Sequence, residues 1–183
     1  TTICDAALRP IGTSPHFRQP PSFENALTQN IGGGNTMVLN RAALDLLQDT
    51  LAHAEQAVAH DWWCYQLVSG AGGRIIYDPD PHVLYRQHIG NEIGANGSLH
   101  AKLRRLGALL SGEYRRWNSK NLSGLRKCRH WLTPASRDVL DRFEAVQNGP
   151  LPSRLHALKA SGLYRQTRAG QAALWAACFL KKL

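Results

Sequence analysis

Short apolar runs alternate with clusters of glycine, proline and asparagine in the first half of the chain. Such runs, bounded by turn residues, are typical of short strands. The runs that predict strands are residues 36–39 (TMVL), 74–77 (RIIY) and 83–86 (VLYR). Between the last two, residues 78–81 (DPDP) predict a turn. Four prolines among polar residues predict a long loop over residues 10–30.

Helical spacing separates these runs and dominates the second half of the chain. Asn40 is placed to cap a helix, and a second helix is expected from His60–Asp61 to Gly72–Gly73. Thr133 followed by Pro134 predicts another helix start. The apolar stripes that support the helices are Leu44/Leu47/Leu51, Leu99/Leu103/Leu106/Leu110, Val139/Phe143/Val146, Leu151/Leu155/Leu158 and Leu174/Trp175/Cys178/Phe179. The pattern predicts an α/β part with a few-stranded mixed sheet and helices over residues 1–97, followed by a mainly helical, basic region over residues 98–183.

The charge of the chain is divided in the same way. Of the 183 residues, the first 96 carry 5 Lys and Arg against 9 Asp and Glu, whereas residues 97–183 carry 17 against 4. Two parts with different partners are therefore expected. The four cysteines are widely spaced without a CxxC pair, which disfavours a metal knuckle or a disulfide framework and favours a reducing compartment. The start at Thr1, without Met, suggests a fragment of a longer protein.

Asp61 is the residue with the clearest catalytic potential. The dipole of the predicted helix favours a negative charge at its first turn, and the side chain there projects from the end of the element. A positioned carboxylate of this kind can take a proton from a hydroxyl group in a general-base step. The alternative is an ordinary helix-capping aspartate.

Trp62 and Trp63 follow directly. An indole face suits the apolar face of a pyranose ring, and the indole N–H can donate to a sugar hydroxyl. Neighbouring helical residues point about 100° apart, so one tryptophan is expected to line a site while the other packs in the core. The alternative, that both belong to the core, stays open.

A glycine-rich turn, residues 32–36 (GGGNT), precedes these residues. Glycine lets the backbone approach a ligand closely at Gly34, and the side chains of Asn35 and Thr36 can hydrogen bond to sugar hydroxyls. The turn is not a phosphate-binding P-loop, because no GK[ST] follows. A tight structural turn is the alternative.

Arg86, Gln87 and His88 end the last predicted strand. The two-residue period of a strand places Arg86 and His88 on the same side. A guanidinium fork and an imidazole suit a diphosphate group or its metal ion, and Gln87 is counted with them as a substrate-binding residue. A structural histidine near a strand end is the alternative for His88.

Residues 31–40 and 59–96, taken together, resemble the acceptor half of a family 2 glycosyltransferase with a GT-A fold, near its rhamnosyltransferase-like bacterial members. The resemblance extends over about residues 31–120. It implies that Asp61 is the base of an inverting sugar transfer, although His60 stands where the family usually has an acidic residue. It also implies contact of His88 with a metal ion or the phosphate, and a nucleotide-sugar donor such as dTDP-rhamnose. The acceptor would be a glycan or a lipid-linked glycan of cell-surface polysaccharide synthesis.

The nucleotide-binding half of that family and its DxD carboxylates are not found in the sequence. Asp78 and Asp80 spell DxD, but they follow Asp61, which is the wrong order for the family, and they predict a turn instead. A divalent metal, Mg or Mn, is therefore expected in the full-length enzyme and not in this chain alone. The chain by itself is expected to be inactive.

The basic second half leaves other functions open. Basic helices with interleaved aromatic residues can follow the phosphates of a nucleic acid, and a scaffold role is a further alternative. No recognised nucleic-acid reader motif is present, so we expect no nucleic-acid partner. Peripheral contact with the anionic inner membrane surface, from a cytoplasmic location, is the favoured interpretation of this charge. An ordinary solvated helical face remains its alternative.

Overall fold

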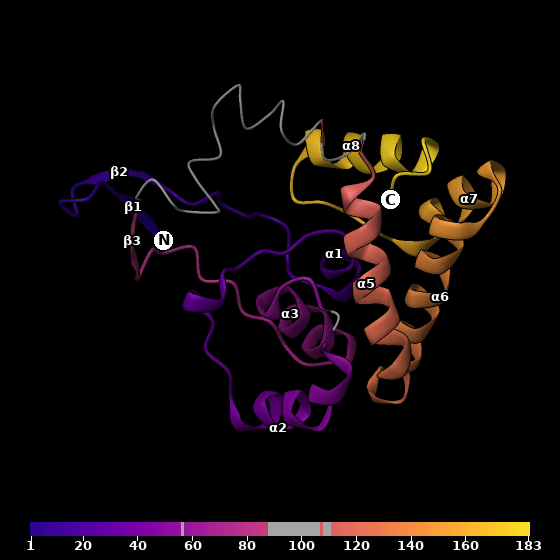
Figure 1. The fold of residues 1–183 in the computed structure, drawn as a ribbon, viewed down its shortest axis with the longest axis horizontal. Coiled ribbons are helices and arrows are strands. Elements are labelled where there is room, and N and C mark those ends of the chain that lie inside the picture. Colours follow the sequence, from indigo (N-terminus) through magenta and orange to yellow (C-terminus); the bar gives the residue numbers. More distant parts are fainter. Residues whose placement is uncertain (56, 88–106, 108–110) are drawn as a thin grey trace.

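A small sheet lies at one end of the molecule and packed helices make up the rest (Figure 1). The computed structural model describes residues 1–55, 57–87, 107 and 111–183. Strand β1 (Thr2–Cys4) is central, antiparallel to β2 (Pro10–Thr13) and parallel to β3 (Leu84–Arg86). The prediction of an α/β fold with a small mixed sheet and a mainly helical second part is confirmed, as is the strand at residues 83–86.

The other two predicted strands are wrong. Residues Gly34–Thr36 form a short 3-10 turn, η1, and residues 37–40 are irregular. The Thr36 N–H and hydroxyl both donate to the Gly33 carbonyl, at 2.9 and 2.8 Å, so local hydrogen bonds close a turn here. The side chain of Val38 is 97% exposed. An apolar run becomes a strand only beside a partner, and this run has none among the described residues.

The run at residues 74–77 has no regular secondary structure and is also unpaired in the described part of the chain. Ile76 is exposed, and the ring of Tyr77 packs on Phe17 with ring centroids 5.7 Å apart. Side-chain packing on the N-terminal segment, rather than a backbone ladder, therefore fixes this stretch.

The predicted loop over residues 10–30 contains regular structure, so that prediction is wrong in part. Strand β2 starts at Pro10, and helix α1 covers Phe23–Ala26. The side chain of Ser22 accepts a hydrogen bond from the Asn25 N–H and caps α1, while Phe23 is buried in the core. Prolines at positions 20 and 21 precede this cap, where they are compatible with a helix start.

Helix α2 (Arg41–Asp49) begins as the sequence predicts. The Asn40 side chain accepts a 2.9 Å hydrogen bond from the Ala43 N–H. The expected apolar face is wrong in part, because Leu44 and Leu51 are exposed while Leu47 and its neighbour Leu46 pack against the core. The 3-10 helix η2 (Leu51–His53) then leads towards α3.

Helix α3 (His60–Gly70) ends as predicted, with Gly72 in the left-handed region at a φ of +84°. It packs on α1 and is apolar around most of its circumference, as expected for a central helix.

Four longer helices follow: α5 (Glu113–Lys127), α6 (Pro134–Asn148), α7 (Leu151–Ser161) and α8 (Arg168–Phe179), with η3 (Arg129–Trp131) between the first two. The predicted cap is confirmed, since the Thr133 hydroxyl accepts the Ser136 N–H at 3.1 Å. The stripe of leucines at 99, 103, 106 and 110 lies outside the described residues. None of the helices in the described ranges is both long and apolar enough to span a membrane.

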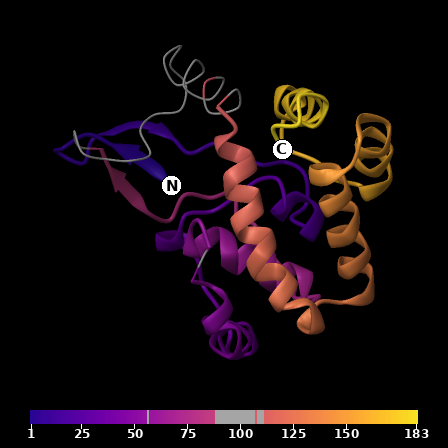
Figure 2. The same cartoon turned by 45° about the vertical axis from the view of Figure 1, so that its right-hand side comes forward.

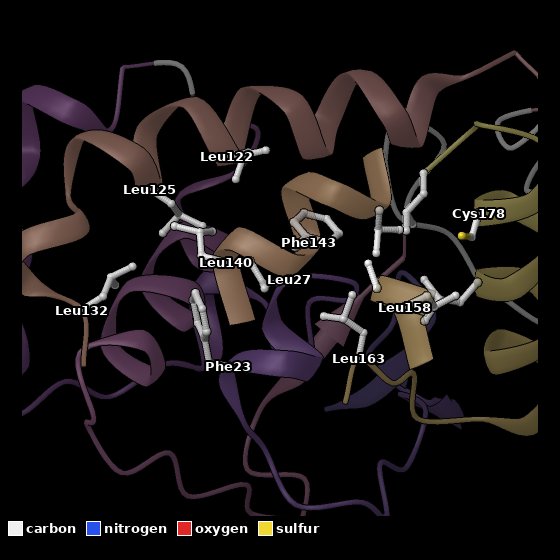
Figure 3. Close-up of a cluster of buried hydrophobic side chains, with 14 of the residues drawn as sticks. Phe23, Leu27, Leu122, Leu125, Leu132, Leu140, Phe143, Leu158, Leu163 and Cys178 are labelled. Atoms are coloured by element: carbon white, nitrogen blue, oxygen red, sulfur yellow. The ribbon is translucent and has the colours of Figure 1, made fainter. Parts of the chain in front are cut away.

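The hydrophobic core joins the two predicted parts of the chain. In the view of Figure 1, α1 and α3 lie on one side of α5, and α6 and α7 lie on the other. Phe23 and Leu27 of the first part point towards Leu125, Leu140 and Phe143 of the second in one cluster (Figure 3). The division between residues 97 and 98 stays a prediction, and both sides of it share this core.

Candidate functional site

Asp61 lies in the first turn of α3 and meets the glycine-rich turn. One carboxylate oxygen accepts the Gly34 N–H at 3.1 Å, and the other accepts the N–H of Trp62 at 2.7 Å. The side chain is half-buried. Two of the predicted site features, 27 residues apart in the sequence, therefore come together in the fold, and the orientation of the carboxylate is fixed by two backbone donors.

The approach of the two elements depends on glycine. A Cβ atom at Gly34 would lie 2.0 Å from Nε2 of His60, far inside van der Waals contact. Asn35 and Thr36, the next two residues of the turn, are exposed. The turn therefore brings two polar side chains to the surface beside Asp61, with the hydroxyl of Thr36 donating to Gly33 and its lone pairs still able to accept.

Both tryptophans are in the interior. The indole of Trp62 is 8% exposed and its N–H donates to the Ala26 carbonyl at 2.6 Å, which ties α3 to α1. Trp63 is 3% exposed, and its six-membered ring packs against Gly124 of α5. Both indoles are largely buried, as the alternative of two core residues expects. The stacking of one of them on a sugar stays a prediction.

Arg86 and Gln87 belong to a different part of the fold. They lie at the end of β3, where the Gln87 N–H donates to the Cys4 carbonyl at 2.8 Å. In both views β3 lies in the sheet, apart from α3 (Figures 1 and 2). The structure therefore does not gather these two residues with Asp61. His88 lies outside the described residues.

A cavity of about 240 Å³ opens beside the start of α3. Its lining residues come from α2, η2, the segment after η2 and α3: Leu47, Leu51, Ala54, Ala57, His60, Trp63 and Cys64. The pKa of the Cys64 thiol is raised, first by burial and then by the charge of Asp61. The Asp61 carboxylate is therefore close enough to act on a group that lines this cavity.

The lining of the cavity is mostly apolar. The buried indole N–H of Trp63 has no hydrogen-bond partner among the described residues, and His60 is exposed at the same helix end. Sequence reasoning missed this cavity. Its signal was the stripe of Leu47 and Leu51, which the spacing placed on one helix face.

The segment Asp78-Pro79-Asp80 is held by local hydrogen bonds of the kind found in turns, as predicted. One carboxylate oxygen of Asp78 accepts the Asp80 N–H and the other contacts Nε2 of His82, both at 2.9 Å. The hydrogen bond from Asp80, followed by that from His82, lowers the pKa of Asp78. Within the described ranges, no group of three or more His, Cys, Asp or Glu side chains is arranged to hold a metal ion.

The chain is similar to one curated protein over about half its length. It is 32% identical over 98 residues to dTDP-rhamnosyl transferase RfbG of Shigella flexneri, which covers 51% of this chain and 34% of that protein. The chain thus spans about a third of the relative's length. No protein-family model matches the chain, and no solved structure matches it. The similarity supports a glycosyltransferase-like relationship.

Proposed function

We propose that this chain forms the acceptor side of a glycosyltransferase, in which Asp61 is the general base of an inverting sugar transfer. The observation that carries the proposal is the half-buried Asp61 carboxylate, oriented by the Gly34 N–H at 3.1 Å beside a cavity. The relationship to a sugar transferase supports the reaction class. A capping aspartate alone would not need a turn from 27 residues earlier in the chain to hold its second oxygen.

The chemistry assigned to Asp61 is one proton transfer. The acceptor hydroxyl oxygen attacks the anomeric carbon of the donor sugar, and the bond from that carbon to the diphosphate oxygen breaks. The bonding electrons leave with the diphosphate, while the hydroxyl proton passes to the carboxylate. A positioned base of this kind contributes about 10²- to 10⁴-fold to the rate.

The exposed polar side chains of the turn suit the acceptor. Asn35 and Thr36 follow Gly34 directly and are open to solvent. Their amide and hydroxyl groups would hydrogen bond to acceptor hydroxyls and hold one of them near Asp61. Arg86 and Gln87 retain a proposed role only towards a substrate long enough to reach the sheet.

The donor assignment follows the relative. Because that protein is named a dTDP-rhamnosyl transferase, we assign dTDP-rhamnose as the donor to be tested first, with a glycan or lipid-linked glycan as the acceptor. The divalent ion expected for such an enzyme finds no set of three ligands in the described ranges, so no step proposed here involves it.

The test is transfer activity of the intact protein that contains this chain, with Asp61→Asn compared with Asp45→Asn. Asparagine keeps one oxygen to accept a backbone N–H but cannot accept the proton. We expect Asp61→Asn to lower kcat by about 10²- to 10⁴-fold with donor KM unchanged. Asp45 is an exposed carboxylate on α2 that pairs with Arg41 at 3.9 Å, and its variant should turn over normally.

Thermal unfolding separates catalysis from folding. If Asp61 is the base, the Asp61→Asn variant loses turnover while its melting temperature stays close to that of the parent. A folded Asp61→Asn protein that keeps its turnover within about twofold would refute the proposal.

The positive charge of the helical region supports a nucleic-acid-binding function only weakly. Several of its arginines have partners within the chain. Arg126 pairs with Glu144 at 2.5 Å, and Arg129 pairs with Asp141 through two contacts of 2.6 and 2.7 Å. Arg115 donates to the carbonyl of Gln147 at 2.8 Å. These guanidinium groups stabilise the helix packing, which reduces the number open to phosphates.

A further inference from the structure

Helix α8 presents an apolar face to the outside. It lies at the outer edge of the molecule in both views and packs inward on α7 (Figures 1 and 2). Its exposed apolar residues recur at helical spacing: Ala169, Ala172, Ala173, Trp175, Ala176, Phe179 and Leu180. The three large ones, Trp175, Phe179 and Leu180, are 38%, 57% and 48% exposed. A surface helix normally turns charged residues outward, so this stripe is a candidate interaction surface.

The one side-chain amide of α8 is turned inward instead. Gln171 accepts the Arg165 N–H at 2.8 Å and donates to the Leu163 carbonyl at 3.3 Å. Between Arg168 and Lys181 the helix carries no charged residue. The polar group that could have made the outer face hydrophilic is therefore used to hold the preceding loop.

Basic residues border the apolar face at both ends. Arg168 begins α8, and Lys181 and Lys182 follow it. The Lys182 side chain lies over Gly112, at the start of α5. A Cβ atom added to Gly112 would lie 3.8 Å from Cδ of Lys182. No Asp or Glu follows Glu144 in the sequence, whereas residues 145–183 contain six Lys and Arg. Helix α8 and the residues at its two ends thus carry positive charges and no acidic side chain.

The position of Lys181 is a second, independent observation. Its φ is +58°, in the left-handed region that glycine adopts most readily. The Lys182 N–H donates to the Ala177 carbonyl at 2.7 Å and the Lys181 N–H to the Cys178 carbonyl at 3.2 Å, which is the hydrogen-bond pattern of a glycine-ended helix. A lysine here is less stable than a glycine, and what it adds is a cation beside Phe179 and Leu180.

We propose that the outer face of α8 docks on the surface of an anionic lipid bilayer. Trp175 and Phe179 would enter the boundary between headgroups and acyl chains, with Lys181 and Lys182 at the headgroup phosphates. With 12 residues, α8 is shorter than the roughly 20 that a spanning helix needs, so it lies in the plane of the surface.

An anionic bilayer fits this face better than the other occupants do. A second copy of the chain would bring the same positive rim against itself, and like charges oppose that contact. A nucleic acid would contact the basic residues but leave the alanine-rich stripe and its aromatic rings in water. A lipid surface accommodates both the apolar stripe and the cations that border it.

The test is sedimentation of the 183-residue chain with vesicles. Vesicles of phosphatidylglycerol mixed with phosphatidylcholine are compared with pure phosphatidylcholine, and duplex DNA is titrated at the same salt concentration. We expect binding to the anionic vesicles that exceeds binding to the neutral ones by about tenfold or more. Trp175→Ser with Phe179→Ser should weaken it by about tenfold or more. Ile76→Ser, which removes an exposed side chain near the sheet, should change nothing.

The lysines are tested with two double variants, each of which removes two positive charges. Lys181→Gln with Lys182→Gln should weaken vesicle binding by about tenfold or more, whereas Lys120→Gln with Lys127→Gln on α5 should have a much smaller effect. Lys181→Gly separates docking from stability, because it should raise the melting temperature while it weakens vesicle binding. If a variant folds poorly, a second measurement is made on the parent chain, namely quenching of its tryptophan fluorescence by brominated lipid. The extent of this quenching should be smaller in Trp175→Phe.

Three results would overturn the proposal. The first is equal binding of the Trp175→Ser/Phe179→Ser chain and the parent chain to anionic vesicles. The second is duplex binding at least as strong as vesicle binding. The third is a dimer in sedimentation velocity that Phe179→Ser dissociates, since the face would then belong to a second copy.

Discussion

The contact between the glycine turn and α3 can be tested by adding a single methyl group. Gly34→Ala places a Cβ 2.0 Å from Nε2, 2.9 Å from Cε1 and 3.0 Å from Cδ2 of His60. Ordinary carbon contacts lie at about 3.5–4.0 Å, so either the imidazole or the turn must move by more than an ångström. If the turn moves, the Gly34 N–H leaves the Asp61 carboxylate.

The expected cost is moderate because His60 is exposed. Turning the ring away into an unfavourable rotamer costs about 0.5–1.5 kcal/mol. Weakening the hydrogen bond from Gly34 to Asp61 adds about 0.5–1.5 kcal/mol. Gly34→Ala should therefore destabilise the chain by about 1–3 kcal/mol, which corresponds to a fall of roughly 2–12 °C in melting temperature for a domain of this size.

Urea unfolding of a double-mutant cycle measures this coupling. His60→Ala alone should lie within about 0.5 kcal/mol of the parent, and in combination it should recover most of the loss caused by Gly34→Ala. Gly32→Ala is the matched control, because its Cβ meets nothing closer than 3.7 Å. The reasoning fails if Gly34→Ala is as stable as Gly32→Ala, or if His60→Ala brings no recovery.

Two further predictions concern buried groups. Arg154 is 6% exposed and donates to the carbonyls of Gly149, Cys178 and Phe179, so Arg154→Met should lower the free energy of unfolding by about 2–4 kcal/mol in urea. The control is Lys159→Met, at an exposed position on the same helix, which should lower it by less than about 0.5 kcal/mol. Equal stability of the two variants would contradict the prediction. The charge of Asp61 helps to raise the pKa of Cys64, so Asp61→Asn should lower that pKa and speed alkylation of Cys64 at mildly alkaline pH, as followed by mass spectrometry. An unchanged alkylation rate would mean that the carboxylate does not act on the cavity.

The candidate site was only partly accessible to sequence reasoning. Asp61 at a helix start and a flexible turn at Gly34 follow from residue type and local pattern, but their hydrogen bond joins segments 27 residues apart. The burial of both tryptophans could not be predicted for the same reason. Whether an indole faces a ligand or the core depends on which elements cover it, here α1 over Trp62 and α5 over Trp63.

The sequence by itself determined several helices and the residues at which they begin or end. Two helices begin at side-chain caps, Asn40 and Thr133, which accept hydrogen bonds from backbone N–H groups three residues later. Helix α3 is followed by Gly72, whose positive φ is a property of that residue. Such signals are local, so they can be detected along the chain without knowledge of the fold.

Only the tertiary structure decided which apolar runs became strands and which faces were covered. Residues 36–39 and 83–86 have similar composition, but only the second finds a partner, β1, from the far N-terminus. The same holds for α2, whose exposed and packed leucines the spacing could not separate, and for α8, whose apolar face is left open. Strand pairing and burial are set by distant segments, and the free energy of those contacts is not encoded in any single stretch of the sequence.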